Sequence, residues 1–275
     1  MKNNIDLTVV IPVHSVADEK FNDLLTGALN SIENNNVHPS NVMIVRCGCS
    51  EVKEVLNDFD VSKYNFHVTI LENKTGKSFQ NQINYAAKNI TTKYFSFLEF
   101  DDEYSVNWFK NVKQYTEAYP DIDMFLPIIT DVTNENNFVG FTNEAAWAYN
   151  FSDTLGHIDH EVLSEYPNIN PDGMVVKTEV FNSVGGYKPG IKLTFNYEFL
   201  LRFTNGGRNI MVIPKIGYKH VNMRPGSLFW QYKNGGVPEM LLTPEEAKFW
   251  MDAAKKEFFY TEDRPIIYEP NETVE

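Results

Sequence analysis

The stretch NKTGKSFQNQINYAAKNITTKYFSFLEFDD, residues 73–102, contains a loop, a helix and a buried strand that leads into charged residues. Phe79, Ile83, Ala86 and Ala87 follow the spacing of one helix face, and polar side chains occupy the other face. Residues 94–100 are apolar enough to form a buried strand. Ligands of open α/β sheets bind beyond the carboxyl ends of strands, so this stretch predicts a site where the strand ends.

The sequence around this stretch alternates short β-rich runs with amphipathic helical segments, which is typical of a mostly parallel sheet flanked by helices. Further strands are predicted at 7–13, 42–45, 67–71, 173–176, 210–213 and 216–218, and further helices at 21–32, 52–56, 178–184, 197–203 and 244–260. Periodicity weakens over 130–170, where we expect a loop-rich insertion. We predict an α/β fold with one main domain, residues 1–230, and a C-terminal helix and tail, residues 231–275.

Four acids stand at the end of the predicted strand 94–100, namely Glu99, Asp101, Asp102 and Glu103. Carboxylates this close together repel one another unless a positive group holds them, and Mg²⁺ or Mn²⁺ is suited to that task. Such a cation would in turn bridge a diphosphate. The alternative is an acidic turn that caps the strand and has no ligand.

The composition argues against a nucleic-acid-binding protein and against a membrane-spanning one. The chain has 37 acidic and 24 basic residues, a net charge of −13, so its overall field repels nucleic acid and anionic membranes. No run approaches the roughly 20 apolar residues that span a bilayer, and the N-terminal residues lack signal-peptide features, so we expect a cytoplasmic protein. Cys47 and Cys49 have neither redox nor zinc spacing, and we expect them to be reduced thiols.

Four segments together resemble the inverting family 2 glycosyltransferases, which have the GT-A fold. These segments are TVVIPVH at 8–14, the stretch 73–102, VFNSVGGYKPG at 180–190 and YEFLLRF at 197–203. The resemblance implies a nucleotide-sugar donor bound on a Rossmann-like sheet. The donor-binding residues that it and the loop positions indicate are Pro12, Val13, His14, Arg46, Lys77, Gln80, Asn81, Glu99, Phe100, Asp101 and Arg224.

The resemblance also implies a metal site. The D-x-D motif of the family matches Glu99, Phe100 and Asp101, and Asp102 follows directly. We expect Asp101 to lie closest to Mn²⁺ or Mg²⁺, with Asp102 and His220 as further ligands, because neutral imidazole also binds divalent metals. For His220 the alternative is a structural role.

Two departures from the family pattern concern the base of the nucleotide and the acceptor. The carboxylate that usually binds the nucleobase is missing at Cys47, so either Arg46 and backbone groups hold the base or the donor is not a uridine nucleotide. The family's catalytic aspartate matches Asn196, which cannot act as a general base. Glu198 is our first replacement for that base, and Asp172 is the second.

The resulting function hypothesis is a metal-dependent, inverting transfer of a hexose or pentose from a nucleotide-sugar to a glycan or another hydroxyl acceptor. A non-catalytic binder of sugar nucleotides or glycans is the main alternative, and Asn196 and Cys47 favour it. A hydroxymethylated base in DNA is an alternative acceptor, which the negative charge disfavours. Aromatic residues that could stack on bases or sugars are Trp147, Phe229, Trp230 and Tyr232, and each could equally fill the core.

Overall fold

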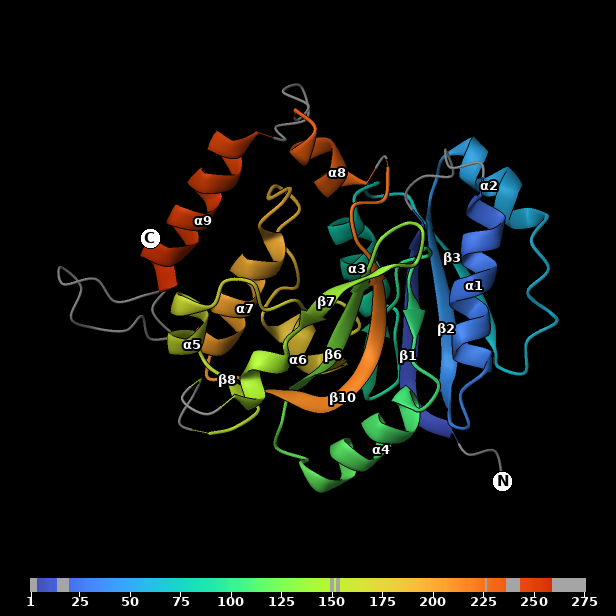
Figure 1. The fold of residues 1–275 in the computed structure, drawn as a ribbon. Helices are drawn as coiled ribbons and strands as arrows, with labels where there is room; N and C mark the ends of the chain where they lie inside the picture. The colour runs from blue at the N-terminus through green and yellow to red at the C-terminus, as the bar shows by residue number, and fades with distance from the viewer. Residues whose placement is uncertain are drawn as a thin grey trace.

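The computed structural model describes residues 4–13, 20–148, 151, 154–225, 227–235 and 243–258. A ten-stranded mixed sheet runs through the molecule, with helices on both faces (Figure 1). The main path of the sheet has the order β3-β2-β1-β4-β9-β6-β10-β5, while β7 pairs with β6 and β8 pairs with β10. The expected α/β fold with a mostly parallel sheet flanked by helices is therefore confirmed.

Six strands of the sheet point the same way. These are β3 (Val68–Asn73), β2 (His38–Cys47), β1 (Asn4–Val13), β4 (Tyr94–Phe97), β6 (Met124–Val132) and β10 (Ile210–Val221). Four short strands run antiparallel to their neighbours, namely β9 (Val175–Lys177), β5 (Glu103–Tyr104), β7 (Phe138–Thr142) and β8 (His157–Ile158). The carboxyl ends of β3, β2, β1 and β4 consequently lie along one edge of the sheet.

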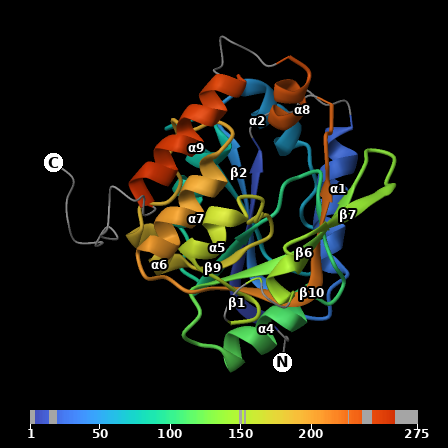
Figure 2. The same ribbon diagram turned by 60° about the vertical axis from the view of Figure 1, so that its left-hand side comes forward.

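Each face of the sheet has its own apolar cluster. On one face α1 (Phe21–Glu33), α2 (Ser50–Asn57) and α4 (Trp108–Ala118) pack against the strands. The other face is covered by α3 (Phe79–Ala87), α5 (His160–Glu165), α6 (Thr178–Ser183), α7 (Phe195–Asn205) and α9 (Pro244–Phe258), and Figure 2 shows α9 alongside α7. In β1 the side chains alternate between the two clusters, since Val9 and Ile11 join the first and Val10 the second.

The segment after residue 230 shares the core of the rest of the chain. Ala254 of α9 is buried in the same cluster as the aromatic residues of α7. The expected boundary at 230 falls inside α8 (Leu228–Lys233), so the helical appendage begins within an element. In the described part of the chain, no helix has the length and apolar character required to cross a bilayer.

Several predicted elements have different bounds in the structure. The strand predicted at 94–100 ends at Phe97, and the acids follow in a turn in which the Asp102 N–H donates to the Glu99 carbonyl (3.1 Å). The predictions at 210–213 and 216–218 belong to one strand, β10, because irregular pairing with β6 accommodates the residues between them. The segment 130–170 is more regular than expected: it contains the end of β6, β7, a 3-10 helix (Glu144–Trp147), β8 and α5.

Candidate functional site

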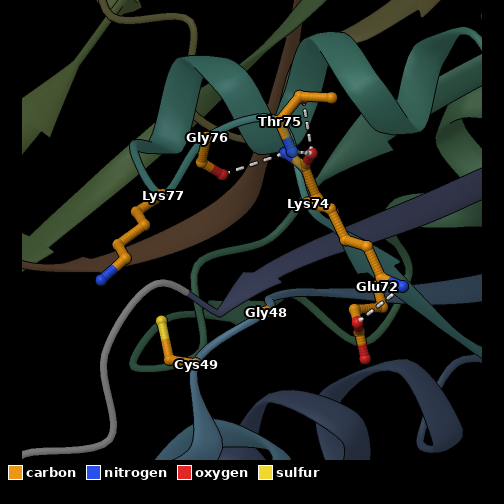
Figure 3. Close-up of a pocket in the computed structure, with 8 residues that line it drawn as sticks. Gly48, Cys49, Glu72, Lys74, Thr75, Gly76 and Lys77 are labelled. Atoms are coloured by element: carbon orange, nitrogen blue, oxygen red, sulfur yellow. Dashed lines mark hydrogen bonds and ion pairs between the residues drawn. The ribbon is translucent and has the colours of Figure 1, made fainter.

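A cavity of about 460 Å³ opens at the carboxyl ends of β2 and β3 (Figure 3). Its lining consists of Gly48 and Cys49 after β2, Glu72 and Asn73 at the end of β3, and the loop residues Lys74, Thr75, Gly76 and Lys77. Asn73 shapes this loop, since its Oδ1 accepts hydrogen bonds from the N–H (2.9 Å) and hydroxyl (2.7 Å) of Thr75. The expected donor-binding residue Lys77 therefore lines a cavity at the predicted edge of the sheet.

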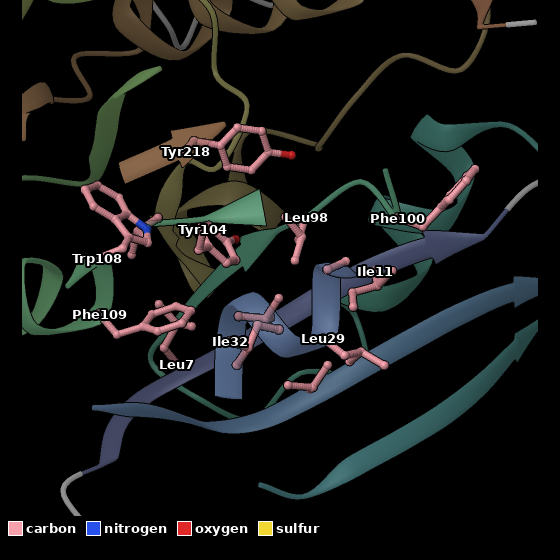
Figure 4. Packing of buried hydrophobic residues seen from close by; sticks show 14 of the residues in the cluster. Leu7, Ile11, Leu29, Ile32, Leu98, Phe100, Tyr104, Trp108, Phe109 and Tyr218 are labelled. Atoms are coloured by element: carbon pink, nitrogen blue, oxygen red, sulfur yellow. The ribbon is translucent and has the colours of Figure 1, made fainter. Parts of the chain in front are cut away.

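The acidic turn after β4 is fixed to β10 by Asp102 and Tyr218. The Tyr218 hydroxyl donates to Asp102 Oδ2 (2.8 Å) and accepts from the Glu99 N–H (3.2 Å), while the Val221 N–H donates to Asp102 Oδ1 (2.8 Å). Tyr218 is fully buried beside Tyr104 and the apolar cluster seen in Figure 4. At Gly173 a Cβ would approach the Tyr218 ring to 2.4 Å, so this position requires glycine. Asp102 thus positions the turn.

Asp101 faces a cation instead of solvent. Arg224 Nε donates to Asp101 Oδ2, and the guanidinium lies over the Phe100 ring, 5.2 Å from its centroid. Phe100 in turn packs against Phe21, with ring centroids 5.1 Å apart. The structure thereby brings three of the expected donor-binding residues, Phe100, Asp101 and Arg224, into one contact group. The Asp101 side chain is 9% exposed, at the end of the fourth parallel strand.

His220 belongs to a second polar group on the same side. Its Nδ1 lies 2.9 Å from Asp131 Oδ1, and the Thr142 hydroxyl donates to Asp131 Oδ2 (2.6 Å). Burial opposes a charge on His220, but the hydrogen bond to Asp131 and the charges of Asp102 and Asp172 raise its pKa to about 10. His220 is therefore a cation at neutral pH, paired with Asp131.

Burial disfavours the ionised forms of the remaining acids of this region, which are Glu99, Asp102 and Asp172. Burial first, and then the charges of Asp101, Asp172 and Asp102, raise the pKa of Glu99 well above its usual range. Burial raises the pKa of Asp102 to about 8 against the opposing charge of His220, and burial also raises the pKa of Asp172. Ionisation of these carboxyls is therefore disfavoured in this structure, and a cation bound beside them would favour their ionised forms.

The side chains near Asp101 could hold a hard divalent cation only if a bound ligand supplied further oxygen atoms. Within the described ranges, no group of three or more His, Cys, Asp or Glu residues is arranged to hold a metal ion. Asp102 already accepts two hydrogen bonds, and His220 is paired with Asp131 through Nδ1. Mg²⁺ binds through one or two carboxylates plus substrate phosphates, and the chemistry at Asp101 suits that arrangement.

Several other expected donor-binding residues have structural partners. Gln80 is buried and its Nε2 donates to the Ile191 carbonyl (2.8 Å), while Asn81 Nδ2 donates to Ser78 Oγ at the N-terminus of α3 (2.9 Å). Pro12 and Val13 are buried at the end of β1, where Val13 offers its carbonyl to Gln82 Nε2 (2.9 Å). His14 lies outside the described residues.

Glu198, the first candidate for the base, is held in an ion-pair network. Arg202 Nε donates to Glu198 Oε1 (2.8 Å) and Nη2 to Oε2 (3.0 Å), and Lys188 Nζ lies 2.9 Å from Oε1. The Glu198 side chain is 3% exposed. Because both oxygens are engaged by cations, this geometry does not support Glu198 as a proton acceptor. The Asn196 Oδ1, at the position of the family's base, is buried and has no hydrogen-bond partner within the described part of the chain.

Asp172, the second candidate, lies in the acidic group. It is 7% exposed, its Oδ2 accepts from Asn170 Nδ2 (2.9 Å), and it interacts electrostatically with Asp101, Asp131 and His220. A buried carboxyl with a raised pKa is a better proton acceptor than an exposed one. The structure therefore favours Asp172 over Glu198.

The expectation that Cys47 and Cys49 are reduced thiols is wrong. They form a disulfide, whose Cα atoms lie 5.3 Å apart, so they are not the reduced thiols that their spacing suggested. Gly48 sits at the bend between them, and a Cα separation of this size is normal for a disulfide. Disulfides are uncommon in reducing compartments, so a cytoplasmic location stays a prediction.

Sequence reasoning missed three residues that organise this edge: Glu72, Asp131 and Tyr218. Glu72 ends a strand that was predicted only as far as residue 71. Asp131 lies in the segment expected to be irregular, and Tyr218 was expected only as part of a strand. A carboxylate directly after a β-rich run was the available signal for Glu72, since it has the same placement as Glu99.

The sequence model of glycosyl transferase family 2 matches residues 8–183, which is most of the chain. No protein with curated annotation shows significant sequence similarity to this chain. The matched residues include most of β1, all of β2 to β4, the cavity, the acidic turn and Asp172.

The solved structures with the same fold include TarS and GalNAc-T7. Residues 1–349 of TarS from S. aureus, in complex with UDP-GlcNAc, are 17% identical with a TM-score of 0.58, and the match covers 81% of this chain and 60% of that one. GalNAc-T7, solved with UDP, GalNAc and Mn²⁺, is 14% identical with a TM-score of 0.64, and the match covers 92% of this chain and 48% of that one. The chain thus spans less than two thirds of either structure's length.

Proposed function

Because the chain belongs to glycosyl transferase family 2 and has the GT-A fold, we propose that it transfers a sugar from a nucleoside diphosphate to an acceptor hydroxyl with inversion. The observation that carries this proposal is the pairing of two features on one sheet edge. A cavity lies at the ends of β2 and β3, and a turn with buried acidic side chains follows β4.

The spacing of these features suits a nucleotide. Neighbouring strands lie about 4.8 Å apart, so the step from β3 across β2 and β1 to β4 is about 14 Å. An extended nucleoside diphosphate is of comparable length. The base would occupy the cavity and the diphosphate would lie toward Asp101. UDP in the TarS and GalNAc-T7 structures supports a nucleoside diphosphate as the donor.

Asp101 would hold a divalent cation together with the diphosphate, and that cation would neutralise charge developing on the leaving group. The Mn²⁺ of the GalNAc-T7 structure supports this part of the proposal. Arg224 lies against Asp101 and is placed to donate to phosphate oxygens, for which a guanidinium has suitable geometry. Asp102 and Tyr218 keep the turn in place and need not touch the donor.

Asp172 acts as the base in this proposal. It accepts the proton of the acceptor hydroxyl, the hydroxyl oxygen forms a bond to the anomeric carbon, and the bond to the nucleoside diphosphate breaks with its electron pair. The positive charge of His220 favours the ionised form of Asp172, whereas the negative charge of Asp131 opposes it. Glu198 stabilises α7 through Arg202 and Lys188 and takes no proton.

The test is sugar-nucleotide turnover with and without Mn²⁺, using UDP-, GDP-, TDP- and CMP-sugars. We expect metal-stimulated release of the nucleotide by the wild type and its loss in Asp101→Ala. Asp121→Ala is the matched control, since Asp121 is exposed on the loop after α4. Unchanged turnover in Asp101→Ala would reject the assignment of Asp101.

A second candidate function is binding without catalysis. Asn196, at the position that the family's base occupies, is the observation that favours it. Calorimetry that detects nucleotide-sugar binding, together with absence of turnover over a panel of sugar and polyol acceptors, would select this alternative. Binding to hydroxymethylated DNA in the same assay would identify the third hypothesis, against which the charge of −13 argues.

A further inference from the structure

Among the residues that the structure describes, one acidic side chain lines the cavity beside β2 and β3. Among the described residues that line it, only Glu72 carries a carboxylate, and the other charged groups are Lys74 and Lys77. The remaining lining atoms belong to small or neutral residues. A ligand in this cavity therefore meets one strong hydrogen-bond acceptor of the side-chain type, and that acceptor is Glu72.

Arg46 on the neighbouring strand β2 fixes the position of the Glu72 side chain. Arg46 stands directly beside Glu72 in the parallel register of β2 and β3, and its Nη2 donates to Glu72 Oε2 (2.9 Å). The Arg46 side chain is 11% exposed, whereas that of Glu72 is 29% exposed, so the open part of this pair is the carboxylate. Lys74 Nζ lies 3.7 Å from Oε1, and the Lys74 side chain is 81% exposed, so this second ion pair is largely solvated (Figure 3).

Arg46 is itself incompletely satisfied. Its Nε and Nη1 are buried and have no hydrogen-bond partner in the part of the chain that the structure describes. A strand-to-strand ion pair whose only role is stability would be expected to use these donors, because unpaired buried donors are costly. The arrangement instead fixes Oε2 through a buried guanidinium, while Oε1 lies beside the exposed ammonium of Lys74, a solvent-screened pair that a ligand can replace.

Nucleobases differ in what they offer to such an acceptor. Uracil, thymine and guanine carry a ring N–H next to a carbonyl, whereas cytosine and adenine present a ring nitrogen lone pair at the same place. A carboxylate accepts hydrogen bonds only, so it pairs with the first group and repels the lone pair of the second. A site built around one acceptor discriminates strongly against analogues that leave it unpaired.

We infer that Glu72 is the specificity-determining residue for the donor's base: it accepts a hydrogen bond from a ring N–H and selects uracil-, thymine- or guanine-containing nucleotides over cytosine- and adenine-containing ones. Arg46 is the positioning residue that orients the carboxylate. This inference rests on the proposed function, because it requires that the cavity receives the base of a nucleoside diphosphate.

The test is calorimetric binding of UDP, GDP, CDP and ADP, each with Mn²⁺, to the wild type and to Glu72→Gln. We expect the wild type to bind UDP or GDP at least tenfold more tightly than CDP and ADP, as one charged hydrogen bond allows. Glutamine can accept from Arg46 and offer its NH₂ to a ring nitrogen, so Glu72→Gln should lose at least tenfold in UDP or GDP affinity and gain affinity for CDP.

The matched control is Glu51→Gln, which changes an exposed glutamate of α2 near the same edge and should leave all four affinities unchanged. Arg46→Met should weaken UDP or GDP binding more than CDP and ADP binding, which narrows the base preference; lost stability alone would weaken all four alike. UDP methylated at N3 supplies a test on the unaltered protein. We expect it to bind at least tenfold more weakly than UDP.

The outcomes separate the two proposals. If the wild type binds no nucleoside diphosphate, the proposed function and this inference both fall. If it binds UDP or GDP but Glu72→Gln keeps the same base preference, or N3-methyl-UDP binds as well as UDP, the inference alone is overturned.

Discussion

Glu198→Ala separates a structural glutamate from a catalytic one. The substitution removes the carboxylate that neutralises Arg202, whose side chain is 17% exposed, and leaves that guanidinium buried without its bidentate partner. Breaking a buried pair in this way costs about 3–5 kcal/mol. For a domain of this size that corresponds to a fall in melting temperature of roughly 6–20 °C.

Urea unfolding followed by circular dichroism measures this loss, and turnover is measured on the same samples below the transition. Glu117→Ala is the control, because Glu117 is an exposed helical glutamate and its removal should change stability by no more than about 0.5 kcal/mol. We expect turnover per folded molecule to stay within the wild-type range. A loss of about 100-fold or more with unchanged unfolding free energy would make Glu198 the base and refute our reading of the ion pairs.

Three further predictions concern the acidic region. Asp172→Asn should lower turnover by about 10²–10⁴-fold while the protein stays folded, and wild-type turnover would remove Asp172 from the mechanism. Mn²⁺ should bind far more tightly in the presence of UDP than alone, since Asp101 supplies few ligands; calorimetry showing equally tight binding without nucleotide would contradict this. A raised pKa means that protonated His220 stabilises the fold below about pH 6.5 and that this contribution is lost as pH rises toward about 10. His220→Gln should therefore lower the melting temperature more at pH 6 than at pH 10, and an equal loss at both would show that the charge pair with Asp131 does not form.

The sequence was sufficient to predict the first half of the fold. The apolar spacing of α1 and α3 and the β-rich runs of β1 to β3 are strong local signals, and the structure has these elements within a few residues of the predicted bounds. The acids after β4 were also predicted to lie at the carboxyl edge, because that placement follows from parallel topology alone.

The second half of the fold was harder to predict from the sequence, because its structure depends on pairing between distant segments. β6 contains Pro127, a residue that is unusual within a strand, yet it pairs with β10, β9 and β7 over most of its length. β10 reads as two runs in the sequence because Pro214, Lys215 and Gly217 interrupt it. Sheet register of this kind is set by tertiary packing, which local periodicity does not report.

The candidate site was predictable in its location more than in its partners. Asp101 and Lys77 lie where the sequence suggested, whereas the pairing of Asp102 with Tyr218, of His220 with Asp131 and of Glu198 with Arg202 depends on contacts across the fold. The sequence therefore located the region of the candidate site. The hydrogen bonds of the structure were needed to distinguish residues that position the site from residues that could contact a ligand.

The most direct test of the central claim is a structure of the protein with UDP and Mn²⁺ bound. Our account predicts the base in the cavity beside Glu72, the diphosphate near Asp101 and Arg224, and the metal ion between Asp101 and phosphate oxygens. A nucleotide bound elsewhere, or a metal ion remote from Asp101, would contradict it.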